Sequence, residues 1–193
     1  MSQQTLSTEA EAPALGAVLR RALLQAGAVS LAIVGVATGP ALVRNWRPLV
    51  ARLARPAHAP DLAALARAPL PVQLHLATLA VAVGCTIVLL AGVKGSRLHR
   101  ALGWTWAAAM LTTAVATLFI PAPDGAPNLF HLGYLHLFAL LTFVSVPRVV
   151  MAARAHDVRR HASVVAGFLV GGLGLAGLFA FLPGRLMWQV MFG

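Results

Sequence analysis

Residues 74–100 read LHLATLAVAVGCTIVLLAGVKGSRLHR, and residues 135–161 read LHLFALLTFVSVPRVVMAARAHDVRRH. Each stretch opens with a histidine between two leucines, continues through a long apolar run and closes on a basic turn with a second histidine. The two histidines are 24 residues apart in the first stretch and 25 in the second. A small residue, Gly84 or Ser145, follows each first histidine at the same offset. The pattern predicts one unit, a membrane hairpin, that is present twice.

The composition also indicates a membrane protein. Of the 193 residues, 59% are hydrophobic and only 10% are charged, and the mean hydropathy is +0.81. A soluble domain of this length needs more polar surface. Several apolar runs reach the roughly 20 residues with which a helix crosses a hydrocarbon core of about 30 Å, and the alternation typical of barrel strands is missing. We therefore predict an all-α, polytopic membrane helical bundle of about five transmembrane helices, the last four forming two repeated hairpins.

The chain divides into four predicted parts. They are an N-terminal tail (1–22), a first transmembrane helix (23–43), an extracytoplasmic interfacial connection (44–70) and a four-helix membrane core with a short C-terminal tail (71–193). Within the connection, Asp61 has the character of a helix N-cap for a short segment. The four spans of the core are expected at about 72–93, 102–120, 129–151 and 162–182.

The net charge of +10 comes from 15 Lys and Arg against 5 Asp and Glu. The basic residues lie in short connections, where they set topology and meet lipid headgroups, so the expected partner is the lipid bilayer and not nucleic acid. The positive-inside rule predicts a multi-pass protein of the cell inner (cytoplasmic) membrane with a cytoplasmic N-terminus. The arginine-rich connection then lies outside, against the rule. The single cysteine, Cys85, lies within a span and excludes a disulfide framework.

Four histidines on four successive spans are the main functional signal. The topology sorts them into an outer pair, His75 and His136, and an inner pair, His99 and His161. In a bundle of four, alternate helices face each other, so each pair can hold one planar ring. Two neutral imidazoles make haem iron a six-coordinate electron carrier. The pattern predicts haem b, one or two per chain, with iron as the metal that all four histidines would bind.

Haem also needs cations for its propionates and space for its ring. Basic residues at the inner side are suited to the propionates: they are Lys94, Arg97, Arg100 and Arg160. Gly84 and Gly103 would let a flat ring approach the backbone. His131 is a reserve ligand, and His58 and His156 are expected to be solvated.

Structural roles compete with haem for the same histidines. An imidazole near a helix end commonly reaches interfacial water or a headgroup, which is the alternative for His99 and His161. For His75 and His136, which are predicted to lie deeper, the alternative is a hydrogen bond between helices. Small residues on one face of the last span indicate close helix packing, through which a homodimer or a partner subunit could form: they are Gly167, Gly171 and Gly174.

The segment from about residue 70 to the C-terminus resembles a widespread bacterial family of predicted multi-span membrane proteins of unknown function. The resemblance is carried by three motifs: Gly95-Ser96-Arg97-Leu98-His99-Arg100-Ala101-Leu102-Gly103-Trp104, Asp157-Val158-Arg159-Arg160-His161 and Leu182-Pro183-Gly184-Arg185. It implies a membrane bundle but no particular activity.

More distantly, the histidine pattern is similar to that of the ascorbate-reducible transmembrane di-haem b-type cytochromes. Leu98-His99-Arg100-Ala101-Leu102-Gly103 resembles their Leu-His-Ser-x-x-Gly segment. The resemblance implies that His75 and His136 bind one haem and that His99 and His161 bind the other. The histidine spacings are shorter here, and the residues of the ascorbate site are not recognisable.

Three function classes follow from these observations. The leading hypothesis is a haem-binding electron-transfer protein, which would be a transmembrane oxidoreductase or an electron-transfer subunit with a quinone or a redox protein as partner. The alternative is a non-redox membrane scaffold or accessory subunit with structural histidines. A small transporter is third, since only a few polar residues could line a path: Gln73, Thr78, Thr112 and Thr113. No motif for a catalytic nucleophile, carboxylate pair or nucleotide loop occurs, so no catalytic residue is assigned.

Overall fold

The computed structural model describes residues 15–53, 56, 58–121, 128–129, 132–133, 136–182 and 185–192. Within this part of the chain, four helical stretches are long and apolar enough to cross a membrane. They are Leu70–Ala91, Arg97–Leu118, His136–Arg154 and Val158–Ala180. The prediction of a polytopic helical membrane protein is therefore confirmed, whereas the fifth crossing, at 23–43, stays a prediction.

Helices make up almost all of the described chain. Their bounds are α1 (Leu15–Leu53), α2 (Leu62–Ala66), α3 (Leu70–Ala91), α4 (Arg97–Leu118), α5 (His136–Arg154), α6 (Val158–Phe168), α7 (Leu175–Ala180) and α8 (Leu186–Phe192). A π-helical segment, η1 (Leu169–Gly174), joins α6 to α7. Two short strands, β1 (Asn128–Leu129) and β2 (Leu132–Gly133), pair antiparallel before α5.

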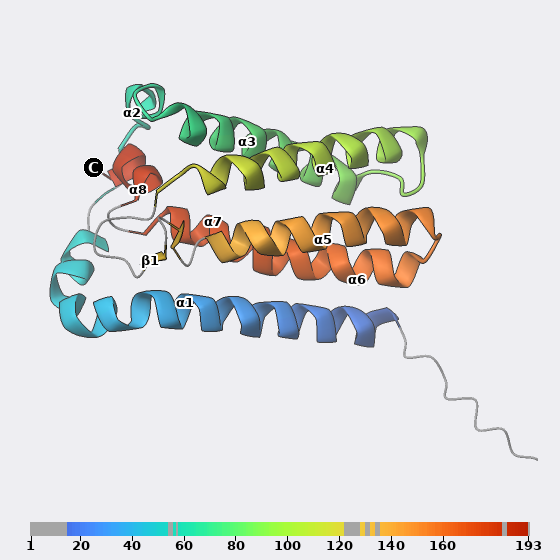
Figure 1. Cartoon of the computed structure of the whole chain (residues 1–193), viewed down its shortest axis with the longest axis horizontal. Coiled ribbons are helices and arrows are strands. Elements are labelled where there is room, and N and C mark those ends of the chain that lie inside the picture. Colours follow the sequence, from blue (N-terminus) through green and yellow to red (C-terminus); the bar gives the residue numbers. More distant parts are fainter. Residues whose placement is uncertain are drawn as a thin grey trace, which may run out of the picture.

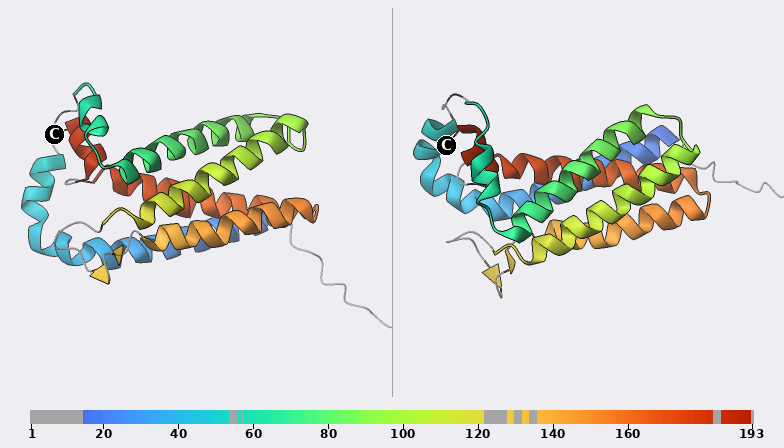
Figure 2. Two further views of the ribbon diagram at one scale, coloured as in Figure 1. Left: turned by 45° about the horizontal axis from the view of Figure 1, so that its top comes forward. Right: turned by 90° about the horizontal axis from the view of Figure 1, so that it is seen from above.

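The four apolar stretches run back and forth as two hairpins (Figure 1). Helix α3 packs on α4, α4 on α5, α5 on α6, and α6 on α1. The connections α3–α4 and α5–α6 lie at one end of the molecule, which we call the tight-turn end, and α2 and α8 lie at the other, the α8 end (Figures 1 and 2). Successive spans therefore start at opposite ends.

The core lies between the two hairpins. It contains Ala82 and Cys85 of α3, several residues of α4 including Trp106 and Met110, and Val146 and Val149 of α5, with Phe168 of α6. Cys85 is thus a small core residue, as expected. Helix α3 buries little else and exposes large apolar side chains, as a lipid-facing helix does: they include Leu74, Val81, Ile87, Val88 and Leu90.

Short polar side chains close the helix ends. Ser96 accepts a hydrogen bond from the backbone N–H of His99 (3.1 Å), and Asp157 accepts one from that of Arg160 (2.9 Å). Asp61 does the same for Ala64 (3.1 Å), which confirms the predicted N-cap of α2. These bonds satisfy N–H groups that the first turn of a helix leaves without a partner.

Helix α1 packs against α6 and η1 through small residues. The hydroxyl of Ser30, which is 1% exposed, donates to the carbonyl oxygen of Gly171 across 3.1 Å. A Cβ added at Gly171 would lie 2.9 Å from Ser30 Oγ and 3.3 Å from Ala26 Cβ, and one at Gly167 would lie 3.7 Å from Ala26 Cβ. The close packing predicted for this glycine face is therefore made within the chain, and a partner helix there would have to replace α1.

Several predicted segments differ from the structure, including the third span, which begins at Arg97 and not near residue 102. Helix α1 is continuous from Leu15 to Leu53, so it includes the predicted first span, the end of the tail and part of the connection. Its last part, coloured cyan, turns away from its first part (Figure 1). Helix α5 begins at His136 and not near residue 129, because β1 and β2 occupy part of that apolar run. The last span contains η1, which a hydropathy pattern does not register.

We expect a Gly171→Val substitution to separate α1 from η1. The new side chain has no space beside Ser30 and Ala26, and overpacking of this kind costs about 1–3 kcal/mol. The thermal midpoint of the detergent-purified protein should fall accordingly. Gly177→Ala is the matched control, because no atom lies within 4 Å of a Cβ at that position. A midpoint equal to that of Gly177→Ala would contradict the packing of α1.

Candidate functional site

The inner histidines meet at the tight-turn end. His99 lies in the first turn of α4 and His161 in the first turn of α6. Their rings are 6.5 Å apart between centroids, with an angle of 67° between the ring planes. The structure therefore brings together the two residues that the sequence predicts as one pair.

A second ring pair continues the same contact seven residues further along both helices. Trp106 of α4 and Phe168 of α6 are 5.7 Å apart between centroids, at an angle of 89°. Gly172 leaves the space for this arrangement, because a Cβ there would lie 2.7 Å from the Phe168 ring. Edge-to-face pairs of this kind stabilise helix packing. The Trp106–Phe168 pair thus fixes the register in which the two histidines face each other.

The hydrogen bonds of His161 define its tautomer. Its Nδ1 lies 3.0 Å from the carbonyl oxygen of Val149, and a carbonyl only accepts, so Nδ1 carries the proton. The neutral ring then has an unprotonated Nε2. A carbonyl at Nδ1 is the usual second support of a histidine that binds metal through Nε2. His161 is therefore held in the form that can bind a metal.

His99 has a ring nitrogen without a partner. Its Nδ1 is buried and makes no hydrogen bond to the described residues. A buried polar atom that lacks a partner is costly, and such an atom in a native protein commonly marks a ligand or an ordered water. Gly103 lies one turn further along α4, and no atom lies within 4 Å of a Cβ added there. His99 thus has a buried ring nitrogen without a partner in the described chain, and α4 has room for a neighbour at Gly103.

His75 lies at the other end, in the second turn of α3, and bonds to α4. Thr117 donates its hydroxyl proton to the carbonyl of Thr113 (2.8 Å), so its oxygen accepts from His75 Nδ1 (3.0 Å). His75 is thus a second Nδ1–H tautomer with an unprotonated Nε2. This is the hydrogen bond between helices that the structural alternative predicts. Thr117 was not expected as the partner of His75. In the sequence, only the spacing of one helical turn between Thr113 and Thr117 indicates a polar face on α4.

His136 differs from His75 in position. It is the first residue of α5, so it does not lie two turns inside a span. Its Nδ1 lies within hydrogen-bond distance of both the backbone nitrogen (3.0 Å) and the carbonyl oxygen (3.1 Å) of Gly133, which suit opposite tautomers of the ring. The Nε2 of His136 is buried and without a partner among the described residues. The hydrogen bonds of both His75 and His136 are to other residues, and no contact between the two rings is found in the described chain.

The basic residues that are predicted to bind the haem propionates make different contacts. Lys94 donates to three carbonyl oxygens, those of Leu89 (2.6 Å), Leu90 (2.6 Å) and Gly92 (3.1 Å), and so closes the C-terminal end of α3. Arg100 donates to the carbonyl of Gly95 at 2.7 Å. Arg97 and Arg160 are exposed at the same end.

The two hairpins have the same spacing between their first histidine and the N-cap of their second helix. The distance from the first histidine to the N-cap residue is 21 positions in both hairpins, from His75 to Ser96 and from His136 to Asp157. The second histidine then follows the cap by three positions in α4 and by four in α6. One position on a helix is a rotation of about 100°. This offset accounts for the unequal histidine spacings of 24 and 25.

The remaining predicted residues have other roles or lie outside the described residues. Gln73 donates to the carbonyls of Ala66 (3.0 Å) and Ala68 (2.7 Å), and Thr78 and Thr113 bond to each other (2.7 Å). These bonds leave few polar groups for a transport path. A Cβ at Gly84 would meet no atom within 4 Å. His58 and His156 are exposed, whereas His131 is not among the described residues. No group of three or more potential metal ligands occurs in the described part of the chain.

Comparisons with protein-family models, with curated proteins and with solved structures gave no match. The family resemblance of the sequence therefore stays a prediction, and the assignment of the site depends on its geometry.

The hydrogen bonds predict the histidine tautomer at two positions of the neutral protein. His75 and His161 should both carry their proton on Nδ1. Solid-state ¹⁵N spectra of histidine-labelled protein in lipid bilayers distinguish the two tautomers, and His→Asn variants assign the signals. An Nε2–H signal from His161 would contradict its bond to Val149 and its readiness to bind a metal.

Proposed function

We propose that the chain is an integral membrane haem b protein that carries electrons, with His99 and His161 as the axial ligands of one haem. A haem held by two imidazoles would supply a one-electron couple. In this proposal the chain's own residues bind and orient the group: α4 and α6 each contribute one ligand from the first turn. The electron partner is a quinone or a redox protein.

One observation carries the proposal, the separation of the His99 and His161 rings. Imidazole nitrogens bond to metals at about 2 Å, so two rings that shared one metal would have centres roughly 6 Å apart. The observed separation is 6.5 Å. The unprotonated Nε2 of His161, the partnerless Nδ1 of His99 and the open space beside Gly103 are consistent with a planar group at this position.

The cations near the pair allow a propionate to be bound at the membrane surface. Arg97 and Arg160 are exposed in the same turns as the two histidines, and both are long enough to move. Lys94 is less suited, because removing it from the end of α3 would leave three carbonyls without their donor. The proposal therefore assigns the propionates to Arg97 and Arg160 first.

The sequence also predicts a second haem between His75 and His136. His136 Nδ1 bonds within its own loop to Gly133, His75 bonds to Thr117 on the neighbouring helix, and no contact joins the two rings in the described chain. These arrangements favour one haem over two. The two-haem interpretation, which treats the hairpins as copies of one unit, is supported by the common spacing of 21 residues from histidine to cap.

The expected orientation of the chain in the membrane supports a haem at the tight-turn end. The basic residues of both hairpin turns lie at the tight-turn end, together with the histidine pair. The positive-inside rule assigns this end to the cytoplasm. The proposal therefore places the haem near the cytoplasmic surface of the cell inner membrane.

The second candidate is a non-redox scaffold or accessory subunit. It is favoured by the hydrogen bonds of His75, His136 and His161, each of which has a partner within the protein. In that case His99 and His161 are an aromatic pair that continues the Trp106–Phe168 contact.

Visible spectroscopy tests the proposal directly. The chain, purified in detergent after expression with haem supplied, should give sharp reduced-minus-oxidised bands and about one haem per chain. His99→Ala and His161→Ala should each lose at least nine-tenths of the bound haem, because each removes one axial ligand.

His156→Ala is the matched control, since His156 is exposed in the α5–α6 turn and should leave the haem content unchanged. Circular dichroism of each variant shows whether the helices persist. A colourless wild-type protein that takes up no added haem would refute the proposal and favour the scaffold. Haem lost on His75→Ala but kept on His99→Ala would refute the ligand assignment.

A further inference from the structure

A pocket of about 560 Å³ lies at the α8 end, away from the histidine pair. It is bounded by α2, the beginning of α3, the end of α4, the end of α7 and α8. Ligand sites in proteins commonly have volumes of about 300–1,000 Å³. Because the pocket lies where membrane-spanning helices begin and end, it is at the depth of the lipid headgroups.

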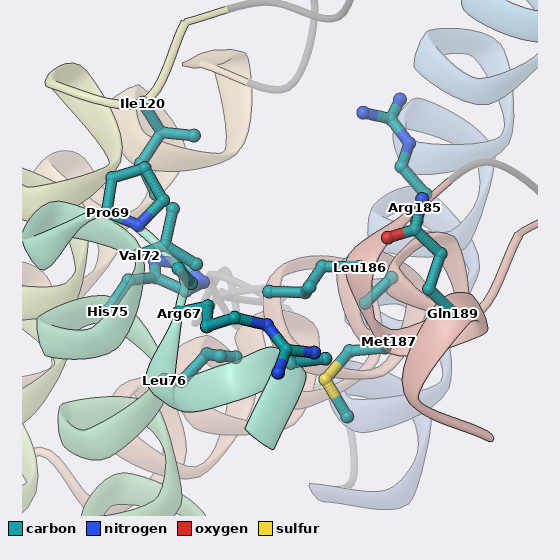
Figure 3. A pocket seen from close by; sticks show the side chains of 13 residues that line it. Arg67, Pro69, Val72, His75, Leu76, Ile120, Arg185, Leu186, Met187 and Gln189 are labelled. Atoms are coloured by element: carbon teal, nitrogen blue, oxygen red, sulfur yellow. The ribbon is translucent and has the colours of Figure 1, made fainter. Parts of the chain in front are cut away.

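The two sides of the pocket are fixed by backbone hydrogen bonds. Helix α2 is held against α8 because His58 N–H donates to the carbonyl of Met191 (2.9 Å) and Asp61 N–H to that of Val190 (3.0 Å). Val72, His75 and Leu76 of α3 face Leu186, Met187 and Gln189 of α8 across the pocket (Figure 3). The pocket is therefore an open groove in which the walls formed by α2 and α8 are joined by hydrogen bonds.

The walls of the pocket combine apolar and cationic groups. Val72, Leu76, Ile120, Leu186 and Met187 supply the apolar surface. Arg67 and Arg185 both line the pocket and supply two positive charges. Arg67 makes a weak contact with Asp61 (3.4 Å), in which the Arg67 side chain is still 70% exposed. The charge and the apolar wall together suit a ligand with an anionic head and an apolar chain.

His75 adds a hydrogen-bond acceptor to the pocket. Its Nδ1–H is held by Thr117 of α4, so the nitrogen left for a ligand in the pocket is the unprotonated Nε2, which accepts hydrogen bonds. An accepting nitrogen is suited to a hydroxyl group, whereas the guanidinium groups are suited to a phosphate. A ligand with both groups offers partners to Arg67, Arg185 and His75, three of the polar residues that line the pocket.

We propose that this pocket binds an anionic phospholipid whose headgroup carries a free hydroxyl, of the phosphatidylglycerol type. The phosphate contacts Arg67 and Arg185, a glycerol hydroxyl donates to His75 Nε2, and the acyl chains leave along the apolar wall into the bilayer. The lipid bridges α2, α3 and α8 and so stabilises the α8 end.

Thermal unfolding of the full-length protein in nanodiscs measures the effect. Nanodiscs with phosphatidylglycerol should raise the midpoint by several degrees over phosphatidylcholine, and phosphatidic acid, which has no glycerol hydroxyl, should raise it less. Glycerol 3-phosphate in solution should have no effect, because it has no apolar chain. A shift with glycerol 3-phosphate as large as that with phosphatidylglycerol would overturn the lipid assignment.

Two variants separate the charge from the hydroxyl contact. Arg67→Gln should remove most of the gain from both anionic lipids. His75→Asn keeps a donor near the position of Nδ1 and removes the acceptor at Nε2, so it should make phosphatidylglycerol and phosphatidic acid equal. Val72→Trp, which fills the pocket and changes no charge, should abolish the gain and so excludes a merely structural effect of Arg67.

Arg154→Gln is the control, because this exposed arginine lies at the tight-turn end. It should keep the full response to phosphatidylglycerol. The proposal is wrong if phosphatidylglycerol and phosphatidylcholine give equal midpoints, or if Arg154→Gln reduces the response as much as Arg67→Gln does.

Discussion

A lipid bilayer offers no hydrogen-bond partner to a polar group, so each polar group within the spans must find one in the chain itself. This constraint accounts for most of the specific contacts of the structure. Thr78 bonds to Thr113, His75 to Thr117 and Ser30 to Gly171, each time across two helices. Because a partner on another helix fixes the register of both, the same bonds that satisfy polar groups also position the histidines.

The four histidines also differ in which ring nitrogen remains without a hydrogen-bond partner in the chain. His75 and His161 have their Nδ1 protons bound and an accepting nitrogen remaining, whereas His136 Nδ1 lies near both the N–H and the carbonyl oxygen of Gly133. Two buried ring nitrogens have no partner in the described chain, Nδ1 of His99 and Nε2 of His136. A metal-binding interpretation is therefore strongest where an accepting nitrogen and a partnerless nitrogen lie close together, which is the case for His161 and His99.

Much of the helical plan follows from the sequence, and particular residues explain the rest. The apolar run of α3 and the cap Asp61 were predictable, because hydropathy and capping are local signals. The start of α5 was not, since an apolar run does not distinguish helix from short strands and β1 and β2 pair there. The 67° ring pair of His99 and His161 depends on Trp106 and Phe168, and Thr117 is a partner of His75 from 42 residues away. Such contacts depend on tertiary packing, which a pattern of residue types does not contain.

The contact between Ser30 and Gly171 joins residues that are 141 positions apart. During synthesis the first helix therefore leaves the ribosome long before the surface that it packs against exists. Contacts between distant parts of a chain form late, and exposed surfaces are open to wrong partners until then. The small-residue surface of α1 must stay without its own partner while α3, α4 and α5 are inserted. The last span packs against both α5 and α1, so a chain that stops before α6 would leave its first helix without the surface that it packs against.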